Sequence, residues 1–598
     1  MQIGYKSKGL ESVLAGVKAL TSAMVVTSFV ILFGFEKPLL PARLLYTVQL
    51  CLLFVFVGGK LLRLLNAESA KEYLYANWYE IPLLVGLGTA VFGAGWLFER
   101  FKPETVRHFS VGIYLVIEVV IKICMTSVNM AASGKNPTRT LIASFLVLIL
   151  SGTGLLMLPR ASTGETLSLV DSLFTATSAT CVTGLIVKDT GTDFTLMGQI
   201  IILTLIQLGG LGIIVFGAVF ALLLGQALSV RESVAMQDLL SARTLGRIGN
   251  MIAFIFVGTL LIEALGAVST FRMWGSVGGR VGGVYEQWFC SIFHSISAFC
   301  NAGFSLFSDS FVKYNRHWAI YIVICPLIVL GGLGFGVLYD LANIAADRVK
   351  VFFRKRLQEH YRLSVEVPAR KRMQLQTRIV LSISAALIVF GTLAILVFER
   401  YTGQGGAGGH QGPGVLGALF QSVTARTAGF NTVDIAALSA SSKFVLILLM
   451  FIGGSPGSTA GGIKTVTLAV VIMTVVATLR RREEVELFKR SIRLVVVGRG
   501  ITVTMLFVAV LFGATLALSV TERENGFTMS QTMFEASSAL GTVGLTTGIT
   551  GSLTTMGKLI IIMVMLIGRL GPLTLLAALT FNLKPARYNY PSEAIIVG

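Results

Sequence analysis

Four stretches of this 598-residue sequence share a pattern of residue types that could do chemistry with main-chain atoms. Each begins with phenylalanine, continues with small and hydroxyl-bearing residues, and ends at a glycine that precedes an apolar residue; they are Phe174–Gly184, Phe293–Gly303, Phe420–Gly429 and Phe534–Gly544. The third is one residue shorter than the others. The glycines recur about every 120 residues, and such a long, nearly constant period indicates four homologous units in one chain.

The chemistry that this pattern favours is the binding of a dehydrated cation by backbone carbonyl groups. Oxygen ligands must replace the water around an ion, and carbonyls do so without a full charge that would trap it. Glycine permits the backbone angles that turn carbonyls inward, and Thr542–Gly544 resembles the filter loop of potassium channels. The alternative is that the glycines serve packing alone. The candidate ligands for potassium are main-chain groups of Cys181, Val182, Thr183, Gly184, Cys300, Asn301, Ala302, Gly303, Thr427, Ala428, Gly429, Thr542, Val543 and Gly544.

The elements that position these loops must lie in a membrane. Hydrophobic residues are 54% of the chain and charged residues 13%, and the mean hydropathy is +0.79, which excludes a soluble protein of this length. About twelve stretches are long and apolar enough to span a bilayer. The six cysteines have no metal-ligand spacing and lie in apolar or filter-like sequence, which argues against a zinc site and a disulfide framework.

We therefore predict an all-α integral membrane protein of four tandem units in pseudo-fourfold arrangement, each a helix, a pore loop and a second helix. A prefix of about four transmembrane helices precedes them. In the second unit, one helix is expected over about 318–345. The predicted divisions are residues 1–136 for the prefix and 137–248, 249–377, 378–499 and 500–598 for the four pore units. A voltage sensor is an alternative for the prefix, but that device needs arginines repeated along one helix.

The second helix of the third unit contains a glycine-rich stretch, residues 453–465, that cannot remain a regular helix. Unwound backbone at membrane depth needs protein or a watery cavity to satisfy its amides, so we interpret the stretch as a gate in the conduction path. A nucleotide-binding loop is the rival interpretation, but Ile463 separates the last glycine from the lysine. The candidate gate residues are Gly453, Gly454, Ser455, Pro456, Gly457, Gly461, Gly462, Lys464 and the intramembrane Arg569.

The formal net charge of +19 is concentrated in the connections between units, at residues 231–247, 348–372, 480–499 and 584–587. The segments that flank the glycine stretches on the other side carry fewer basic residues. By the positive-inside rule, these connections are cytoplasmic and the loops open outward. The basic residues thus indicate a plasma (inner) membrane protein in contact with lipid and do not require a nucleic-acid partner.

The strings TCVTGL at 180–185, SAFCNAGFSLF at 297–307, RTAGFNTVD at 426–434 and GTVGLTTG at 541–548 resemble the Trk/Ktr/HKT superfamily of cation transporters over residues 137–585. The resemblance implies a potassium-translocating subunit, a homodimer with one pore per protomer, and a gate formed by 453–465 with Arg569. It also implies a separate cytosolic RCK-type ring that binds nucleotides, with no organic cofactor in this chain. The prefix and Cys181 depart from the family pattern.

Two other functions remain open from the sequence. A sodium-permeable or sodium/proton-coupled relative would share the same architecture. A multi-pass membrane enzyme would need a converging acid, base or nucleophile. Against the enzyme, the five histidines have neither metal nor triad spacing; they are His108, His294, His317, His360 and His410.

Overall fold

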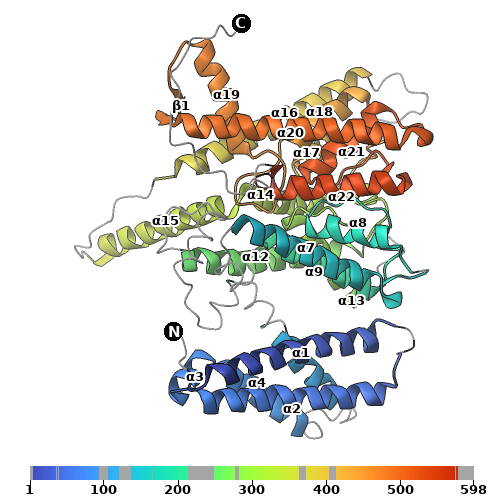
Figure 1. The fold of residues 1–598 in the computed structure, drawn as a ribbon. Helices are drawn as coiled ribbons and strands as arrows, with labels where there is room; N and C mark the ends of the chain where they lie inside the picture. Colours follow the sequence, from blue (N-terminus) through green and yellow to red (C-terminus); the bar gives the residue numbers. More distant parts are fainter. Residues whose placement is uncertain are drawn as a thin grey trace, which may run out of the picture.

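A computed structural model describes residues 5–35, 37, 39–92, 106–119, 121, 137–164, 166–212, 218, 248–275, 282–361, 372–402, 413–572, 574 and 576. These residues are predominantly helical (Figure 1). The α-helices are α1 (Lys8–Phe33), α2 (Ala42–Asn66), α3 (Ala70–Ala76), α4 (Glu80–Phe92), α7 (Pro137–Leu156), α8 (Leu169–Thr180), α9 (Leu196–Leu211), α12 (Ile248–Thr270), α13 (Val284–Phe299), α14 (Cys325–Leu333), α15 (Phe335–Tyr361), α16 (Leu375–Thr402), α17 (Val415–Thr424), α18 (Ala440–Phe451), α19 (Thr465–Leu479), α20 (Leu494–Thr521), α21 (Met529–Gly541) and α22 (Thr555–Leu570).

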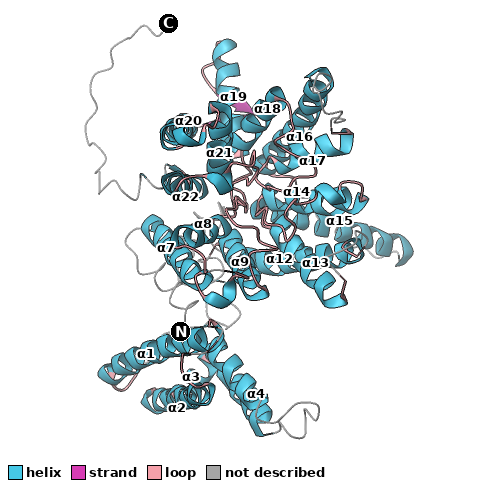
Figure 2. Cartoon of the chain, turned by 90° about the vertical axis from the view of Figure 1, so that its right-hand side faces the viewer, coloured by secondary structure: helices cyan, strands magenta, loops and turns pink. Residues whose placement is uncertain are grey.

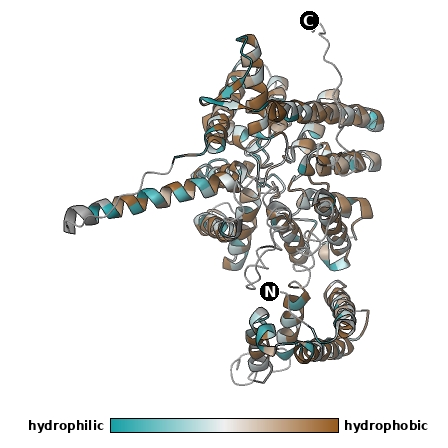
Figure 3. Ribbon diagram, turned by 60° about the vertical axis from the view of Figure 1, so that its left-hand side comes forward, coloured by the Kyte–Doolittle hydropathy of each residue, from teal (hydrophilic) through white to brown (hydrophobic). Residues whose placement is uncertain are grey.

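Six of the described helices are long and apolar enough to cross a membrane: α1, α2, α7, α12, α16 and α20. A helix satisfies its own backbone polar groups, which is why such apolar runs are stable as helices in lipid. Their outer faces carry large apolar side chains, for example Val147 at 64% and Leu265 at 66% exposure, and Figure 3 shows predominantly apolar outer helices. This is the surface of a multi-pass membrane protein.

The described part of the chain after residue 136 contains four groups of helices. Each has a long helix, a short helix and a further helix; the groups are α7–α8–α9, α12–α13–α14, α16–α17–α18 and α20–α21–α22. Hydroxyl side chains cap the short helices α8 and α21, where Ser168 and Thr528 accept from backbone N–H groups of the first turn. The loops that follow the short helices gather at the centre of this body (Figure 2).

The prediction of one helix over about 318–345 is wrong. Residues Ile320–Leu333 and Phe335–Arg354 form two helical segments that meet at an angle of 106°. The break lies at Gly334, whose φ of +91° is a left-handed backbone angle. The Phe335 N–H then donates to the Gly457 carbonyl at 2.9 Å, so a contact with the glycine-rich loop replaces a bond inside the helix.

Helices α9 and α22 also end at a glycine with positive φ, namely Gly212 (+82°) and Gly571 (+84°). Most residues that follow these two glycines lie outside the described residues. In the third group, α18 ends at Phe451 and α19 begins at Thr465, so the glycine-rich segment between them is not helical. Within the described residues, the second helices of the second and third groups are therefore interrupted, whereas the sequence suggested an interruption in the third alone.

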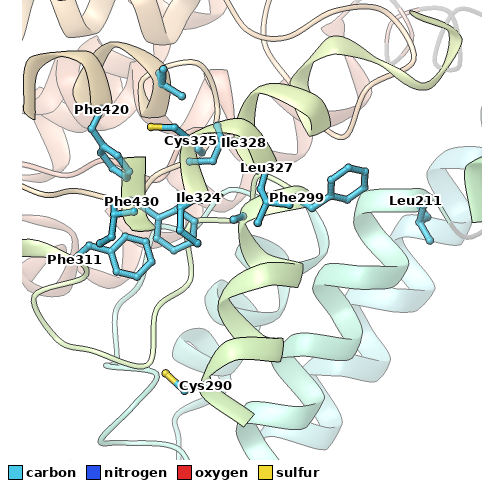
Figure 4. Packing of buried hydrophobic residues seen from close by; sticks show 14 of the residues in the cluster. Leu211, Cys290, Phe299, Phe311, Ile324, Cys325, Leu327, Ile328, Phe420 and Phe430 are labelled. Atoms are coloured by element: carbon cyan, nitrogen blue, oxygen red, sulfur yellow. The ribbon is translucent and has the colours of Figure 1, made fainter. Parts of the chain in front are cut away.

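Aromatic side chains fill the space between the second and third groups. Phe311, Phe420 and Phe430 are fully buried, and the rings of Phe311 and Phe430 stack with centroids 4.7 Å apart. Figure 4 shows them beside Ile324 and Ile328 of the neighbouring segment. Because Phe420 begins the repeated pattern and Phe430 follows its glycine, this core fixes both ends of the third loop.

Two of the basic connections between the groups are partly described. Helix α15 projects from the body (Figure 3), and strands β1 (Val485–Leu487) and β2 (Arg490–Ile492) form an antiparallel hairpin with Val485 opposite Ile492. The basic residues at 231–247, 362–371 and 584–587 lie outside the described residues.

Helices α1 to α4 form a bundle of their own beside the first group (Figure 1). Its interior contains ion pairs: Glu118, 1% exposed at its side chain, pairs with Lys60, and Lys60 lies 3.5 Å from Glu80. The bundle meets the larger body at the loop after α1, where the Arg160 N–H donates to the Gly34 carbonyl at 3.1 Å.

Candidate ion-conduction site

The four repeated stretches have the same backbone conformation. Each short helix ends just before its loop, and the terminal glycine has a positive φ, as does the residue two positions earlier. In the first loop these residues are Gly184 (+87°) and Val182 (+57°). The other pairs are Asn301 with Gly303, Thr427 with Gly429, and Thr542 with Gly544. This alternation of left-handed angles is common to all four loops, including the third, which is one residue shorter.

The four glycines form a closed ring. A methyl group on Gly184 would collide with the Ala302 carbonyl oxygen and lie 3.1 Å from the Gly303 Cα. In the same way, a methyl group on Gly303 would meet the Ala428 carbonyl oxygen and the Gly429 Cα. One on Gly429 would meet the Val543 carbonyl oxygen and the Gly544 Cα. Gly544 in turn lies against the Thr183 carbonyl and Gly184. The structure thus brings together all four predicted loops, each touching the next and the last touching the first.

N–H groups of the loops donate hydrogen bonds to residues at the ends of the short helices. In the first loop the Thr183 N–H donates to the Ser178 carbonyl at 2.8 Å, and the Gly184 N–H donates to the Ser178 hydroxyl at 3.1 Å. Ser538 accepts in the same way from Val543 and Gly544 in the fourth loop, at 2.8 and 3.0 Å.

The second and third loops use a hydroxyl group differently. The Ser297 hydroxyl donates to the Phe304 carbonyl at 2.8 Å, and the Thr424 hydroxyl donates to the Phe430 carbonyl at 2.7 Å. These hydroxyl residues were not among the predicted site residues. The sequence feature that marks them is a serine six residues before the glycine in three stretches, and a threonine five residues before the glycine in the shorter stretch.

All fourteen candidate ligand residues are buried except Gly303, which is half-buried. The hydroxyl groups of Thr183 and Thr427 are buried and have no hydrogen-bond partner among the described residues. The ends of the four short helices lie next to the ring, so the negative ends of their dipoles point toward a cation held there. The arrangement offers oxygen ligands without a carboxylate, which suits a cation that must pass through.

Glycines in the second helices allow the loops to approach this closely. A methyl group on Gly209, Gly331 or Gly568 would collide with a carbonyl oxygen at the end of a short helix, those of Thr180, Phe299 and Leu540 respectively. Their role therefore goes beyond the helix-to-helix packing that small residues serve in membranes.

The glycine-rich segment 452–464 lies against the second and fourth groups. Its Ser455 N–H donates to the Gly332 carbonyl at 3.0 Å, and its Gly461 N–H donates to the Thr542 hydroxyl at 3.1 Å. Thr542 belongs to the ring region, so the segment contacts a candidate ligand residue directly. Lys464, which the sequence grouped with the gate, donates to the Ala460 carbonyl within the same segment at 2.7 Å.

Arg569 joins three parts of the molecule. Its guanidinium group donates to the Thr459 carbonyl in the glycine-rich segment and to the Gly209 carbonyl at the end of α9; the Gly210 carbonyl is 3.3 Å away. Within the described residues, neither Arg569 nor Lys464 forms an ion pair with a carboxylate. The Arg569 guanidinium and the Lys464 side chain therefore lie among main-chain oxygens.

The first and fourth groups also meet through an ion pair. Lys558 at the start of α22 lies 2.7 Å from Asp171 at the start of α8. The described histidines do not converge: His294 hydrogen-bonds to the Cys290 carbonyl of its own helix at 2.8 Å, and the His108 ring stacks on Tyr46. No cluster of metal-binding side chains occurs among the described residues.

Comparison with known proteins gives a consistent result. The family model TrkH, described as a cation transport protein, matches residues 109–588. The Ktr system potassium uptake protein B of Bacillus subtilis is 36% identical over 473 residues, covering 77% of this chain and 97% of that protein. The potassium/sodium uptake protein NtpJ of Enterococcus hirae is 35% identical over 469 residues, covering 77% and 97%.

Among solved structures, the potassium transporter TrkH from Vibrio parahaemolyticus has a TM-score of 0.57 and 19% identity, and covers 84% of this chain and 98% of that chain. This likeness shows a shared fold. The helical membrane architecture and the family match define a multi-pass cation transport protein and not an enzyme. The chain belongs to the TrkH family, as a membrane subunit of the Trk/Ktr/HKT type.

Proposed function

We propose that this protein takes up potassium across the plasma membrane through a selectivity filter made by the four loops. The observation that carries the proposal is the closed ring of glycines, in which a carbonyl oxygen of each loop lies against the glycine of a neighbouring loop. Such a ring can replace the hydration shell of an alkali cation. The ligands are the fourteen residues predicted from the sequence, Cys181–Gly184, Cys300–Gly303, Thr427–Gly429 and Thr542–Gly544.

In this proposal the four helical groups are pore units with the divisions 137–248, 249–377, 378–499 and 500–598, and residues 1–136 are an accessory transmembrane prefix. Supporting it, each group has the same sequence of long helix, short helix, loop and further helix. The basic connections face the cytoplasm, because positive residues are retained on that side, and the ring then opens outward.

Potassium is the proposed ion for two reasons. The relatives that match over most of their length are named potassium uptake or potassium/sodium uptake proteins. All four loops keep their glycine, so none places a side chain into the ring. Competition of sodium with rubidium in the flux assay below separates a potassium-selective transporter from a sodium-permeable one.

We further propose that residues 453–465 and Arg569 form the gate. The segment contacts Thr542 of the filter, and Arg569 ties it to the first pore unit through Gly209. Movement of this segment would alter its contact with Thr542 and, at the same time, the position of the Arg569 charge. A homodimer and a cytosolic nucleotide-binding ring are the proposed assembly, with α15 and the β1–β2 hairpin as basic docking elements.

The test of this function is rubidium flux into liposomes that contain the purified protein. Gly184→Asp or Gly544→Asp should abolish flux, because the new side chain collides with a neighbouring main chain and adds a full charge to the ring. Gly551→Asp is the matched control, since Gly551 is exposed and its Cβ would approach other atoms no closer than 3.9 Å. Undiminished, selective flux in both ring variants would rule out this filter.

A further inference from the structure

A small cavity, with about 20 Å³ open to the centre of a water-sized sphere, lies behind the glycine-rich segment, between α14, α16 and the end of α17. Aliphatic side chains such as Ile328 and Ile388 form most of its wall. Two polar side chains, Arg426 and Ser384, and the backbone of Gly454 complete it. The filter, the gate and the comparisons leave this cavity without a role.

The charge of Arg426 has no counter-charge in the described structure. A guanidinium group is always protonated in proteins. The Nε of Arg426 is buried without a hydrogen-bond partner. Its terminal nitrogens make only long contacts, 3.4 Å to the Ser384 carbonyl and 3.5 Å to the Gly453 carbonyl, and within the described residues no carboxylate forms an ion pair with it. A buried charge in this state is strongly unfavourable unless an anion is supplied.

Ser384 provides a second free donor in the same cavity. In this protein, serine and threonine in the membrane helices usually donate to a carbonyl one turn earlier, as Thr392 does to Ile388 at 2.7 Å. Ser384 is 4% exposed, yet its hydroxyl has no hydrogen-bond partner among the described residues. The free polar side-chain atoms of the cavity are therefore N–H and O–H donors, and such a set selects an anion over a cation.

The fold itself does not require a positive charge at this position. Three residues before the ring glycine, the first, second and fourth loops have Cys181, Cys300 and Gly541, all uncharged. Arg426 is the counterpart in the third loop, directly before the candidate ligand Thr427. The charge is thus specific to the loop whose own second helix carries the glycine-rich segment.

We propose that this cavity binds a small monovalent inorganic anion, such as chloride, held by the Arg426 guanidinium and the Ser384 hydroxyl. This inference rests on the proposed function. The bound anion neutralises a positive charge beside the cation path and so favours cation occupancy of the filter. Because Arg426 also donates to Gly453, the anion and the gate segment share one side chain. Cation flux then depends on the anion present.

Bromide is the probe for the site, measured by its anomalous scattering in crystals of the full chain. The wild type should show a bromide peak within hydrogen-bond distance of Arg426. Arg426→Gln should abolish the peak, and Ser384→Ala should weaken binding on the order of tenfold through loss of one hydrogen bond. Arg400→Gln, at the exposed end of α16, is the control and should keep the peak. A cavity filled by water alone in the wild type would overturn the proposal.

The second arm is rubidium flux with chloride replaced by gluconate, which is too large for the site. The replacement should lower flux severalfold in the wild type and in Arg400→Gln. The fall should be smaller in Ser384→Ala, and flux should not change in Arg426→Gln. Equal wild-type flux in both salts would overturn the coupling to transport. If Arg426→Gln does not fold, Arg426→Lys and Ser384→Ala replace it. A bromide peak without any rubidium flux would overturn the transport function alone, whereas flux without a peak would overturn the anion site alone.

Discussion

Four residues of the filter loops that are not glycine adopt left-handed backbone angles: Val182, Asn301, Thr427 and Thr542. This conformation costs an L-residue about 1–2 kcal/mol, and the cost is highest for a β-branched residue such as Val182. Hydrogen bonds from the loops to the ends of the short helices hold these angles. The loops are therefore fixed by their supports before an ion arrives, which is the condition for replacing its hydration shell at low cost.

Gly303→Ala tests the ring without adding a charge. The new methyl group would lie 2.7 Å from the Ala428 carbonyl oxygen and 3.0 Å from the Gly429 Cα, so the third loop must shift. We expect lower selectivity for potassium over sodium and slower rubidium flux, measured in proteoliposomes.

Gly526→Ala is the matched control for backbone strain. Gly526 has nearly the same φ, +66° against +69° for Gly303, but a methyl group there meets nothing within 4 Å. A loss of selectivity of equal size in both variants would mean that strain, and not crowding of the ring, causes the effect.

At this scale the sequence predicted the four loops but not their supports. The glycines stand out because their spacing repeats and few other residues can replace them. Ser178, Ser297, Thr424 and Ser538 are hidden in runs of small residues, where several hydroxyl groups are available. Which of these hydroxyls meets a loop N–H depends on how the helix ends, and that is settled only by the folded backbone.

At the scale of elements, the second helices of the second and third groups are broken. The bend at Gly334 and the segment between α18 and α19 contact each other through Phe335 and Gly457. Apolar residues continue on both sides of each break, so hydropathy alone predicts an unbroken span. The glycine pattern repeats in Gly209–Gly212 and Gly331–Gly334, but the turn is decided by hydrogen bonds between segments distant in sequence.

Arg569→Gln tests the proposed gate. The substitution removes the charge and shortens the donor group, so the ties to Thr459 and Gly209 are lost. We expect rubidium flux to rise and to become independent of any regulatory partner, because the glycine-rich segment is released and a positive charge leaves the path.

Arg523→Gln, an exposed position after α20, is the control and should leave flux unchanged. A second variant, lacking part of 453–465, removes the segment itself and should raise flux in the same way. If both gate variants lower the flux of correctly inserted protein, the segment supports the pore instead of closing it.

At the scale of the whole molecule, helices α1 to α4 of the N-terminal bundle precede the family match, which begins at residue 109, whereas Glu118 lies within the match. Its ion pairs lie inside a bundle whose outer faces are apolar. The sequence predicted about four transmembrane helices here, and the need for repeated arginines along one helix argued against a voltage sensor. It did not predict the pairing of Lys60 with Glu118, because the partners lie 58 positions apart.

Glu118→Gln should destabilise this bundle by about 3 kcal/mol, because it removes one partner of a buried ion pair and leaves Lys60 with Glu80 alone. Thermal unfolding of the purified protein measures the loss. The double variant Lys60→Met, Glu118→Leu removes both charges of this pair and should recover part of the stability, because Glu80 and Lys18 lose their partners at the same time.

Rubidium flux per inserted molecule should remain unchanged in both variants, since the bundle meets the pore body through Gly34 and Arg160, away from the ring. A change in ion selectivity without a change in thermal stability would show instead that the bundle acts on the filter.

The ion pair between Lys558 and Asp171 closes the circle of four units within a single polypeptide. In an assembly of identical subunits, one altered codon changes every quadrant at once. Here each quadrant is encoded separately, so evolution can place an arginine in one and a long unwound segment in another without changing the others. A point mutation in this gene therefore acts on one quarter of the wall around the ion, and its effects can be graded where those of a symmetric tetramer would be all or none.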